Sequence, residues 1–430
     1  MQQNRGKMMK QAYLIGMSIL LCLGISAQES LEHAALVVNI GVEVRVFDKG
    51  QFVDGLTLQD FEVLEDGVKQ KLEAVYLIKK DLITRKEEKK TKFNPETSRT
   101  FFLFFELSQY LPRVGEAVDF FMENILLPND SLIVVTPVNT YRLKEKGLDI
   151  KPREEIAKEL KGILKKDAFM GDAEYRSTLK DLEGIASTLS NRLLSPDGEG
   201  NSPEKSEKTF QGSGAISTPG IGYLSIEEIV TLYSSYLQKL DTLRKVNEER
   251  FYDFAKYLKA RDGQKYVFLF YQREFIPQID SKTLTQVAGA YQNMGGIDLS
   301  HLTLDIAEGY KRDVPVDVDR VRKAFADASA VVNFLFITKS PEHVPGVTFT
   351  EQSNDIFAPF MEMAKSTGGF HDSSMNPSRL FQDAVEASEN YYLLYYAPKN
   401  FKTDGKFRTI EVRIKGKNYI VKYRAGYYGN

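Results

Sequence analysis

The sequence predicts an α/β protein with a doubly wound, mostly parallel sheet and a small β-sandwich made from both ends of the chain. Continuous apolar runs such as 100–105 (TFFLFF) and 331–337 (VVNFLFI) are typical of strands buried on both faces. Segments with helical spacing separate these runs, and this alternation favours a parallel sheet covered by helices. Alternation of apolar and polar residues at 42–46 and 407–414 predicts half-buried strands near the two chain ends.

The composition excludes several classes of protein. A net charge of −2 over 430 residues excludes a strongly basic nucleic-acid binder, so we expect no nucleic-acid partner. The single cysteine, Cys22, excludes a disulfide framework and a cysteine-rich metal site. The four scattered histidines do not favour a zinc site; they are His33, His301, His343 and His371.

Residues 1–27 have the three zones of a secretory signal peptide. Basic residues come first, and an apolar core at 12–24 is too short to span a bilayer comfortably. Small residues then lead to Ala27, after which we expect cleavage. An uncleaved membrane anchor is the alternative. No later stretch is long and apolar enough for a membrane helix, so the sequence predicts a cysteine-free mature protein, secreted or periplasmic.

Residues 28–81 are predicted to form an N-terminal β module. We expect strands at 36–46, 61–65 and 71–78, a short return at 52–53, a turn at 48–50, a hairpin turn at Asp66-Gly67 and a helical turn at 56–61 capped by Thr57. A charged linker, 82–98, follows. Its positive charges are interrupted by Glu87 and Glu88, which indicates a solvated linker or an exposed strand edge in preference to a binding patch.

Residues 99–398 are predicted to form the α/β domain. The expected strands are 100–105, 131–138, 266–271, 331–337 and 391–396. The expected helices are 112–127, 225–260, 282–294, 318–329, 355–365 and 378–389. Ligands of such sheets bind beyond the carboxyl ends of the strands.

A helical insertion, 150–260, interrupts this alternation. It contains expected helices at 152–165 and 172–194, and then 195–222, whose Gly, Ser, Pro and charged residues predict disorder. The long helix after it either packs in a core or forms a protruding hairpin that contacts a partner. At the C-terminus, 399–430 is predicted to contain a hairpin of 407–414 and 419–423 that packs on the strand 36–46.

Three groups of motifs resemble the bacterial VWFA-related domain family, exported proteins built on a von Willebrand factor type A domain. Residues 42–67 (VEVRVFDKGQFVDGLTLQDFEVLEDG) are similar to its N-terminal signature. Residues 364–369 (AKSTGG) are similar to a late helix-to-loop element, and 391–396, 404–414 and 424–427 (RAGY) to its C-terminal strands. The resemblance implies a Rossmann-like type A fold for the α/β domain.

The same resemblance implies a divalent-ion site at the top of the sheet. In this chain, several of the ligand residues of that site are replaced. Where the family has D-x-S-x-S, residues 106–110 read ELSQY; Ser108 matches, Glu106 is one methylene longer, and Tyr110 is bulky. Where an Asp-Gly pair is expected, Gln272-Arg273-Glu274 stands. We therefore predict a degenerate site without cofactor, because Mg²⁺ requires near-ideal octahedral oxygen ligands. Binding of Ca²⁺ through Glu106 and Glu274 is the alternative.

Two further motifs receive structural interpretations. The pairs Gly295-Gly296 and Gly368-Gly369 lack the strand–loop–helix context of a phosphate cradle and are predicted to cap helix C-termini. Residues 371–374 (HDSS) place serines beside a histidine, but neighbours in sequence rarely form a catalytic triad.

The predicted function is a non-enzymatic protein-interaction module at the cell envelope. The candidate partner-binding residues are Gln109, Tyr110, Arg273 and Phe275. Three alternatives remain open. These are a divalent-cation-dependent adhesion protein, a structural component of an envelope assembly that uses the 150–260 insertion, and an envelope hydrolase, for which the sequence offers no constellation of acid, base and nucleophile.

Overall fold

The computed structural model of the chain describes residues 38–89, 93–143, 147–194, 221–243, 247–279, 282, 316–338, 340, 344–351 and 353–429. The predicted signal peptide, most of the predicted disordered loop, and Gly295-Gly296 with nearly all of the helix expected at 282–294 lie outside these residues. Contacts divide the chain into Met1–Asn39 and Ile40–Asn430. The second unit contains every element described below.

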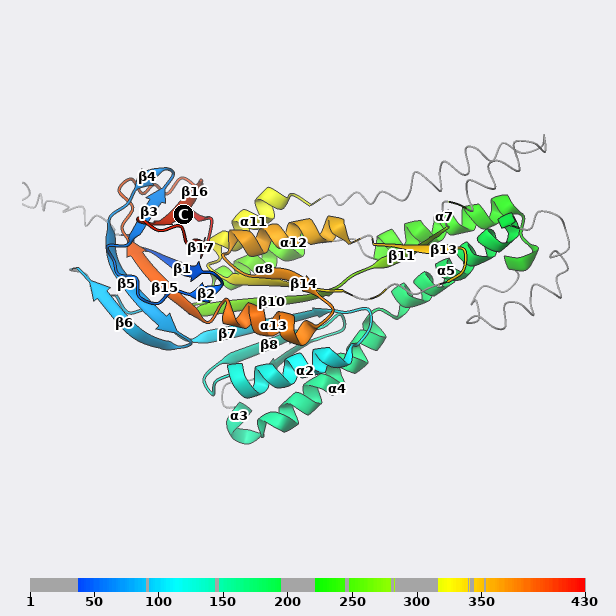
Figure 1. The fold of residues 1–430 in the computed structure, drawn as a ribbon, viewed down its shortest axis with the longest axis horizontal. Helices are drawn as coiled ribbons and strands as arrows, with labels where there is room; N and C mark the ends of the chain where they lie inside the picture. The colour runs from blue at the N-terminus through cyan, green and yellow to red at the C-terminus, as the bar shows by residue number, and fades with distance from the viewer. Residues whose placement is uncertain are drawn as a thin grey trace, which may run out of the picture. The chain divides into compact units, whose positions relative to one another are not determined.

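A six-stranded sheet, called sheet C, has the order β14-β12-β10-β7-β8-β9 (Figure 1). Its strands are β7 (Arg99–Glu106), β8 (Ser131–Val135), β9 (Thr140–Leu143), β10 (Gln264–Gln272), β12 (Val331–Ile337) and β14 (His371–Ser374). All neighbours pair in parallel except β9, which runs antiparallel to β8 at one edge. The prediction of a mostly parallel sheet in a mixed α/β protein is therefore confirmed.

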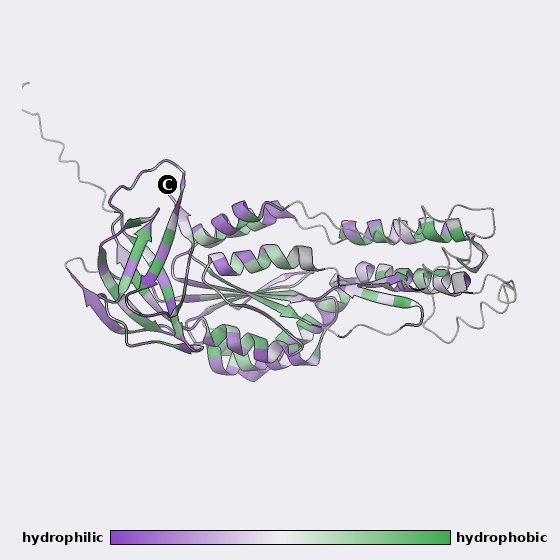
Figure 2. Cartoon of the chain, turned by 45° about the horizontal axis from the view of Figure 1, so that its top comes forward, coloured by the Kyte–Doolittle hydropathy of each residue, from purple (hydrophilic) through white to green (hydrophobic). Residues whose placement is uncertain are grey.

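Helices cover both faces of sheet C because its strands are apolar on both faces. On one face, Phe101, Leu103 and Phe105 pack with α2 (Pro112–Phe120), its continuation η1 (Phe121–Ile125), α4 (Arg153–Gly171) and α13 (Pro377–Glu386). On the other face, Phe102 packs with α8 (Glu248–Lys259), α11 (Val318–Asp327) and α12 (Asn354–Ser366). Figure 2 shows the same division, with hydrophobic residues along the sheet and on the inward sides of the helices.

Two antiparallel sheets combine strands from both ends of the chain. Sheet A has the order β17-β1-β15-β5-β6, with β2 paired to β1, and the other sheet has the order β18-β16-β3-β4. Their strands are β1 (Ile40–Asp48), β2 (Gln51–Phe52), β3 (Phe61–Glu65), β4 (Val68–Lys69), β5 (Leu72–Lys79), β6 (Leu82–Glu88), β15 (Asn390–Tyr396), β16 (Phe407–Ile414), β17 (Ile420–Tyr423) and β18 (Gly426–Tyr428). The C-terminal β17 pairs with the N-terminal β1, as the prediction for the two chain ends requires.

The prediction that 391–396 is the fifth strand of the parallel sheet is wrong. This segment is β15, which lies antiparallel between β1 and β5 in sheet A. The strand beside β12 is β14, whose sequence HDSS carries no apolar run. A continuous apolar run indicates a strand buried on both faces, and it does not distinguish a parallel from an antiparallel neighbour. The α/β part therefore ends before β15.

The predicted hairpin of 407–414 with 419–423 is also wrong. β16 and β17 belong to different sheets, since β16 pairs with β3 and β18 while β17 pairs with β1. The backbone N–H of Lys415 donates to the carbonyl of Asp60, which holds the turn between them against the N-terminal module. The hairpin turn predicted at Asp66-Gly67 is confirmed, because β3 pairs across it with the short β4. The strand expected at 71–78 is β5, which pairs with β15 in sheet A and not with β3.

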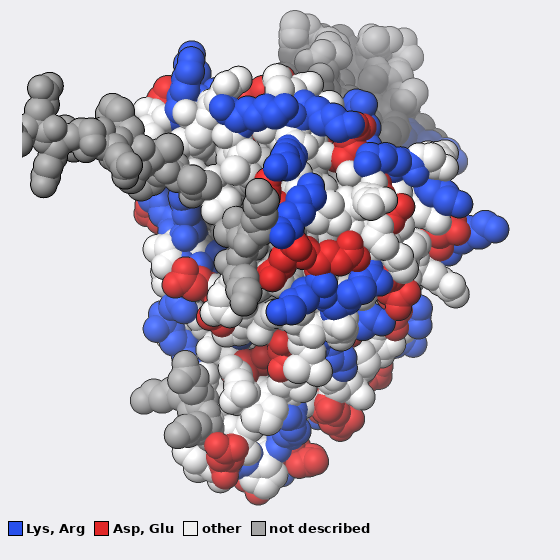
Figure 3. Space-filling model, turned by 90° about the vertical axis from the view of Figure 1, so that its left-hand side faces the viewer, with Lys and Arg blue, Asp and Glu red and all other residues white. Residues whose placement is uncertain are grey.

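The first part of the predicted linker 82–98 forms the edge strand β6, paired with β5. The sequence left open a solvated linker or an exposed strand edge here, and residues 82–88 form the strand edge. Its charges and those at the end of β5 have nearby counterions, as in the pairs Lys79–Asp54 and Arg85–Glu87. Figure 3 shows positive and negative side chains interspersed on the face that it presents.

The insertion differs from its prediction in two ways. The single helix expected at 225–260 is two helices, α7 (Ile226–Leu243) and α8, and the Asn247 side chain caps α8 by accepting from the backbone N–H of Arg250. In addition, α4 and α8 pack on sheet C. The short elements α3 (Gly147–Ile150) and η2 (Ile221–Tyr223) complete this region.

The rest of the insertion has a core of its own. α5 (Ala173–Leu194) and α7 pack with β11 (Phe275–Ile279) and β13 (Val347–Glu351), two strands that the sequence did not predict. The apolar stripe of α7 is buried there at Ile229, Tyr233 and Leu240, which favours the core-packing alternative. None of the helices in the described part of the chain combines the length and the apolar character that crossing a bilayer demands.

Candidate functional site

The carboxyl edge of sheet C brings together the residues that the sequence analysis compared with an ion site. Tyr271 of β10 lies opposite Glu106 of β7, so the loops after these strands are neighbours. The Gln272 side-chain oxygen, Oε1, accepts hydrogen bonds from Ser108 Oγ and from the backbone N–H of Gln109, both at 3.0 Å. The structure therefore joins Ser108 and Gln272 directly.

This arrangement does not fit a divalent cation. The orientation of the Gln272 amide is determined by the backbone N–H of Gln109, which can only donate, so Oε1 faces the loop and already has two donors. Its Nε2 is buried and has no hydrogen-bond partner among the described residues. A hard cation needs oxygen atoms with free lone pairs. Within the ranges that the structure describes, no group of three or more His, Cys, Asp or Glu residues is arranged to hold a metal ion.

The other residues of the predicted ion site have separate contacts. The Tyr110 hydroxyl lies over α2, only 2.7 Å from where a Cβ on Gly115 would stand. Burial raises the pKa of Tyr110. Glu274 is buried and accepts a hydrogen bond from the Tyr271 hydroxyl at 3.2 Å. Glu106 is exposed at the end of β7.

The four predicted partner-binding residues divide into two pairs. Gln109 and Tyr110 line a pocket, together with Ser108 and residues of α4 and α5. Arg273 lies with its guanidinium 5.0 Å from the ring centre of Phe336, and Phe275 is a half-buried residue of β11; neither lines that pocket.

The pocket beside Gln109 and Tyr110 has a volume of about 460 Å³. The remaining lining residues are Gly162, Lys165, Lys166, Ala168, Phe169 and Arg176. Arg176 Nη1 donates to the carbonyl oxygens of Ser108, at 3.0 Å, and Ala168, at 2.6 Å, and so ties the β7 loop to the end of α4. No signal in the sequence marks these basic residues as a group, because they come from helices whose charged residues are typical of solvated faces.

The remaining motifs have structural roles. Gly368, at φ +72°, and Gly369 end α12: the N–H of Gly369 donates to the Ala364 carbonyl and that of Gly368 to the Lys365 carbonyl, the Schellman pattern. The C-cap prediction is confirmed for this pair. Residues 371–374 form the strand β14, in which alternate side chains face opposite ways, and the Asp372 carboxylate accepts from the N–H of Ser373.

The motifs that carry the family resemblance hold sheets together. The Glu65 carboxylate is buried and accepts from the hydroxyls of Tyr396, at 2.6 Å, and Tyr427, at 2.9 Å. Asp66 Oδ1 accepts from the backbone N–H and the hydroxyl of Thr409. These contacts join β3 to β15, β18 and β16, so the signature residues explain the β architecture.

These tyrosines lead to a prediction for alkaline pH. Burial raises the pKa of Tyr396 and Tyr427, and their bonds to Glu65 raise it further; burial also raises the pKa of Tyr391. Unfolded tyrosines ionise at about pH 10. Above that pH the unfolded chain loses protons that the folded chain retains, so the free energy of unfolding should fall. We expect part of the tyrosinate absorbance to appear only together with loss of the circular dichroism signal. Full ionisation near pH 10 in a folded protein would contradict this.

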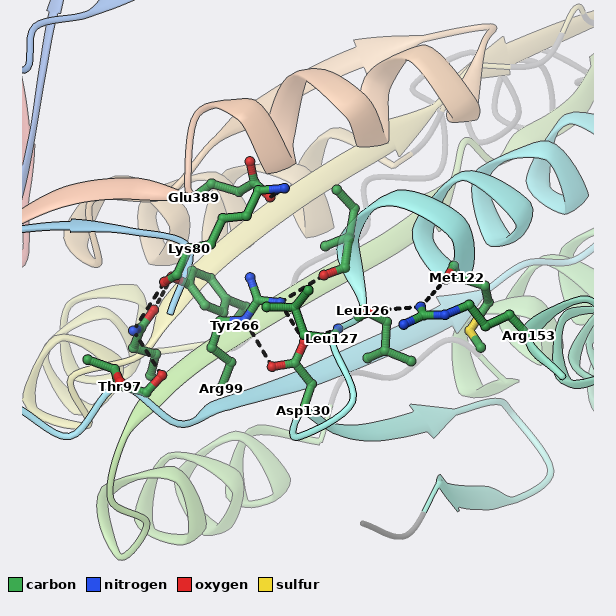
Figure 4. A network of polar contacts seen from close by, with 12 residues as sticks. Lys80, Thr97, Arg99, Met122, Leu126, Leu127, Asp130, Arg153, Tyr266 and Glu389 are labelled. Carbon is green, nitrogen blue, oxygen red and sulfur yellow. Dashed lines mark hydrogen bonds and ion pairs between the residues drawn. The ribbon is translucent and has the colours of Figure 1, made fainter. Parts of the chain in front are cut away.

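A second polar network lies at the amino end of sheet C, and the sequence did not predict it (Figure 4). Arg99 and Asp130 are both buried, and Arg99 Nε donates to Asp130 Oδ1 at 2.9 Å while Nη2 donates to Oδ2 and to the carbonyl of Ile125. Asp130 Oδ2 also accepts from the N–H of Leu127 at 2.6 Å. Charged residues at the start of strands are usual in solvent-exposed turns, so no sequence signal indicated this pair.

The same network continues toward sheet A. The Gln264 side chain donates to the carbonyl of Thr97 at 3.3 Å, and Lys80 lies 3.8 Å from the Glu389 carboxylate. From the other side, Arg153 of α4 donates to the carbonyls of Met122 and Leu126 at the end of η1. These contacts tie η1, α4 and the starts of the strands together, and the charges at their centre, Arg99 and Asp130, are buried.

A pocket of about 460 Å³ lies at the carboxyl edge of sheet C, and a smaller one, of about 180 Å³, lies at the amino end, where Gln264 and Val331 contribute to its lining. Comparison of the chain with protein-family models, with curated proteins and with solved structures finds no match.

Proposed function

We propose that this chain is an exported, non-enzymatic protein-interaction module of the VWFA-related type, and that a partner protein docks at the carboxyl edge of sheet C. One observation carries the proposal. The Gln272 amide closes the position of an ion by bonding to Ser108 and Gln109, while a pocket of about 460 Å³ lies directly beside these residues. Binding at this edge agrees with the general location of ligand sites in α/β sheets.

The finer architecture is part of the same proposal. Sheet C, with helices on both faces, is read as a type A-like domain, and sheet A with the β18-β16-β3-β4 sheet as a sandwich. The support comes from the strands at the two chain ends, since β1 pairs with β17 and β3 pairs with β16.

The proposal predicts that binding at this edge is independent of divalent cations. Calorimetric titration of the mature chain with Mg²⁺, Mn²⁺ or Ca²⁺ should show no heat of binding to a defined site. The reason is that Gln272 Oε1 already accepts two hydrogen bonds and has no lone pair left for a cation. The Glu106→Ala variant should behave identically. Micromolar binding that this substitution removes would instead support cation-dependent adhesion.

The docking edge is tested by site-specific cross-linking. A photoreactive amino acid at the half-buried Tyr110 would disturb packing, so we choose Gln109, an exposed loop residue, and compare it with exposed Lys417 in the turn between β16 and β17. In cells that produce the protein, the variant with the photoreactive amino acid at position 109 should form a discrete cross-linked product with the partner. The variant with it at position 417 should not form this product. The same product from both positions, or none from Gln109, would contradict the proposal.

A deletion distinguishes docking at the carboxyl edge of sheet C from the alternative, in which the insertion is the contact with an envelope assembly. Removal of 195–220 should leave the cross-link from Gln109 unchanged, because Gln109 belongs to the loop after β7. Loss of that cross-link in a folded deletion variant would point to the insertion as the contact.

A further inference from the structure

The pocket at the carboxyl edge of sheet C is lined by basic side chains without a carboxylate. Lys165, Lys166 and Arg176 contribute to its walls, and no Asp or Glu does. Both lysines are exposed, and the structure shows neither an ion pair nor a hydrogen bond for either one within the described ranges. The carboxylates of the adjoining strand ends, Glu106 and Glu274, do not line the pocket.

Arg176 is a fixed cation in this wall. Its guanidinium donates to three neutral carbonyl oxygens, those of Ser108, Ala168 and Phe169, and it lies 5.1 Å from the ring centre of Phe169. Carbonyl oxygens and an aromatic face orient the charge without cancelling it. The fold therefore fixes the position of one positive charge in the pocket wall.

The pocket wall formed by Ser108 and Gln109 is held in place from behind. Gln272 is 3% exposed and does not itself line the pocket, and its Oε1 accepts hydrogen bonds from Ser108 Oγ and from the backbone N–H of Gln109. These bonds fix the loop after β7, so this wall of the pocket has a defined position.

The rim of the pocket is apolar. Phe169 is 73% exposed and lines it, and the next residue, Met170, is 54% exposed. Adjacent exposed side chains of this size indicate a contact surface. A nucleic acid would require a longer basic stripe, whereas three cations with an aromatic rim suit one acidic residue with apolar neighbours.

We infer that this pocket binds an aspartate or glutamate side chain of the partner protein, with the flanking apolar residues of the partner against Phe169. Lys165, Lys166 and Arg176 supply the charge. The inference rests on the proposed function and specifies the chemistry of its partner.

The experiment is a selection of random displayed peptides on the mature chain. We expect enrichment of peptides with Asp or Glu next to Leu, Phe or another large apolar residue, and weaker binding at higher salt. The double variant Lys165→Glu/Lys166→Glu should lower the affinity of a selected peptide about tenfold or more. The matched control Lys158→Glu/Lys180→Glu reverses two exposed charges of α4 and α5 that do not line the pocket, and it should leave affinity unchanged.

The outcomes separate this inference from the proposed function. Selected peptides without acidic residues that still cross-link to Gln109 would overturn the inference and leave the docking edge in place. Acidic peptides unaffected by Lys165→Glu/Lys166→Glu would overturn it as well, as would displacement of the peptide by inorganic phosphate at lower concentration than by the acidic peptide itself. Failure to select any peptide, combined with no cross-link from Gln109, would overturn both.

Discussion

Replacement of Asp130 with alanine is expected to destabilise the protein by about 3–5 kcal/mol, because it leaves Arg99 charged and buried without its partner. Arg99 is 2% exposed and its guanidinium bonds to both carboxylate oxygens of Asp130 and to the Ile125 carbonyl. The carboxylate also holds the turn before β8 through the N–H of Leu127. Removing it therefore breaks a side-chain pair and a turn at once.

The measurement is urea unfolding followed by circular dichroism. Asp54→Ala is the control, since it removes an ion pair with Lys79 in which both side chains are largely exposed and such pairs contribute little. The double variant Arg99→Met/Asp130→Leu should recover much of the loss, because it leaves no unpaired charge. A loss for Asp130→Ala no larger than that for Asp54→Ala would show that the pair is not buried as described.

Gly369→Ala is expected to have the second large effect, a loss of about 3 kcal/mol, the upper end for overpacking. A Cβ at this position would stand 2.0 Å from the backbone oxygen of Val332, in the fully buried strand β12. Backbone in a central strand cannot move aside without disturbing its hydrogen bonds to both neighbouring strands. The same glycine provides the last hydrogen bond of the α12 cap.

A second glycine provides the matched control for this substitution. Gly162 lies on the exposed side of α4, and a Cβ there would meet nothing within 4 Å. Gly162→Ala should therefore raise stability by about 0.5–1 kcal/mol, the usual difference between the two residues in a helix. Equal stability of Gly369→Ala and the wild-type chain in the same unfolding experiment would contradict the close approach of α12 to β12.

Local patterns in the sequence were sufficient to locate most elements. The apolar runs of β7, β10 and β12 and the helical spacing of α2 and α11 are properties of short windows, and each element lies within a few residues of its prediction. Short polar strands such as β14 carry no such pattern, and they were missed for that reason.

The candidate site likewise has residues that the sequence indicated and residues that only the structure brings together. The resemblance implied that Ser108 matches a position of an ion site and that Gln272 replaces another. It did not show that their side chains bond to each other, nor that Lys165, Lys166 and Arg176 line a pocket beside them. The residues of β7, α4, α5 and β10 are brought together by packing of elements far apart in the chain.

By itself, the sequence determined the mixed α/β class and the buried strands, since these follow from residue type and spacing within short segments. Tertiary structure decided which strands pair. The runs 331–337 and 391–396 both predict buried strands, yet one lies in the parallel sheet and the other between β1 and β5. Local spacing establishes only that a segment forms a buried strand. Its neighbours are selected by the packing of the whole chain, because pairing joins segments that are remote in sequence.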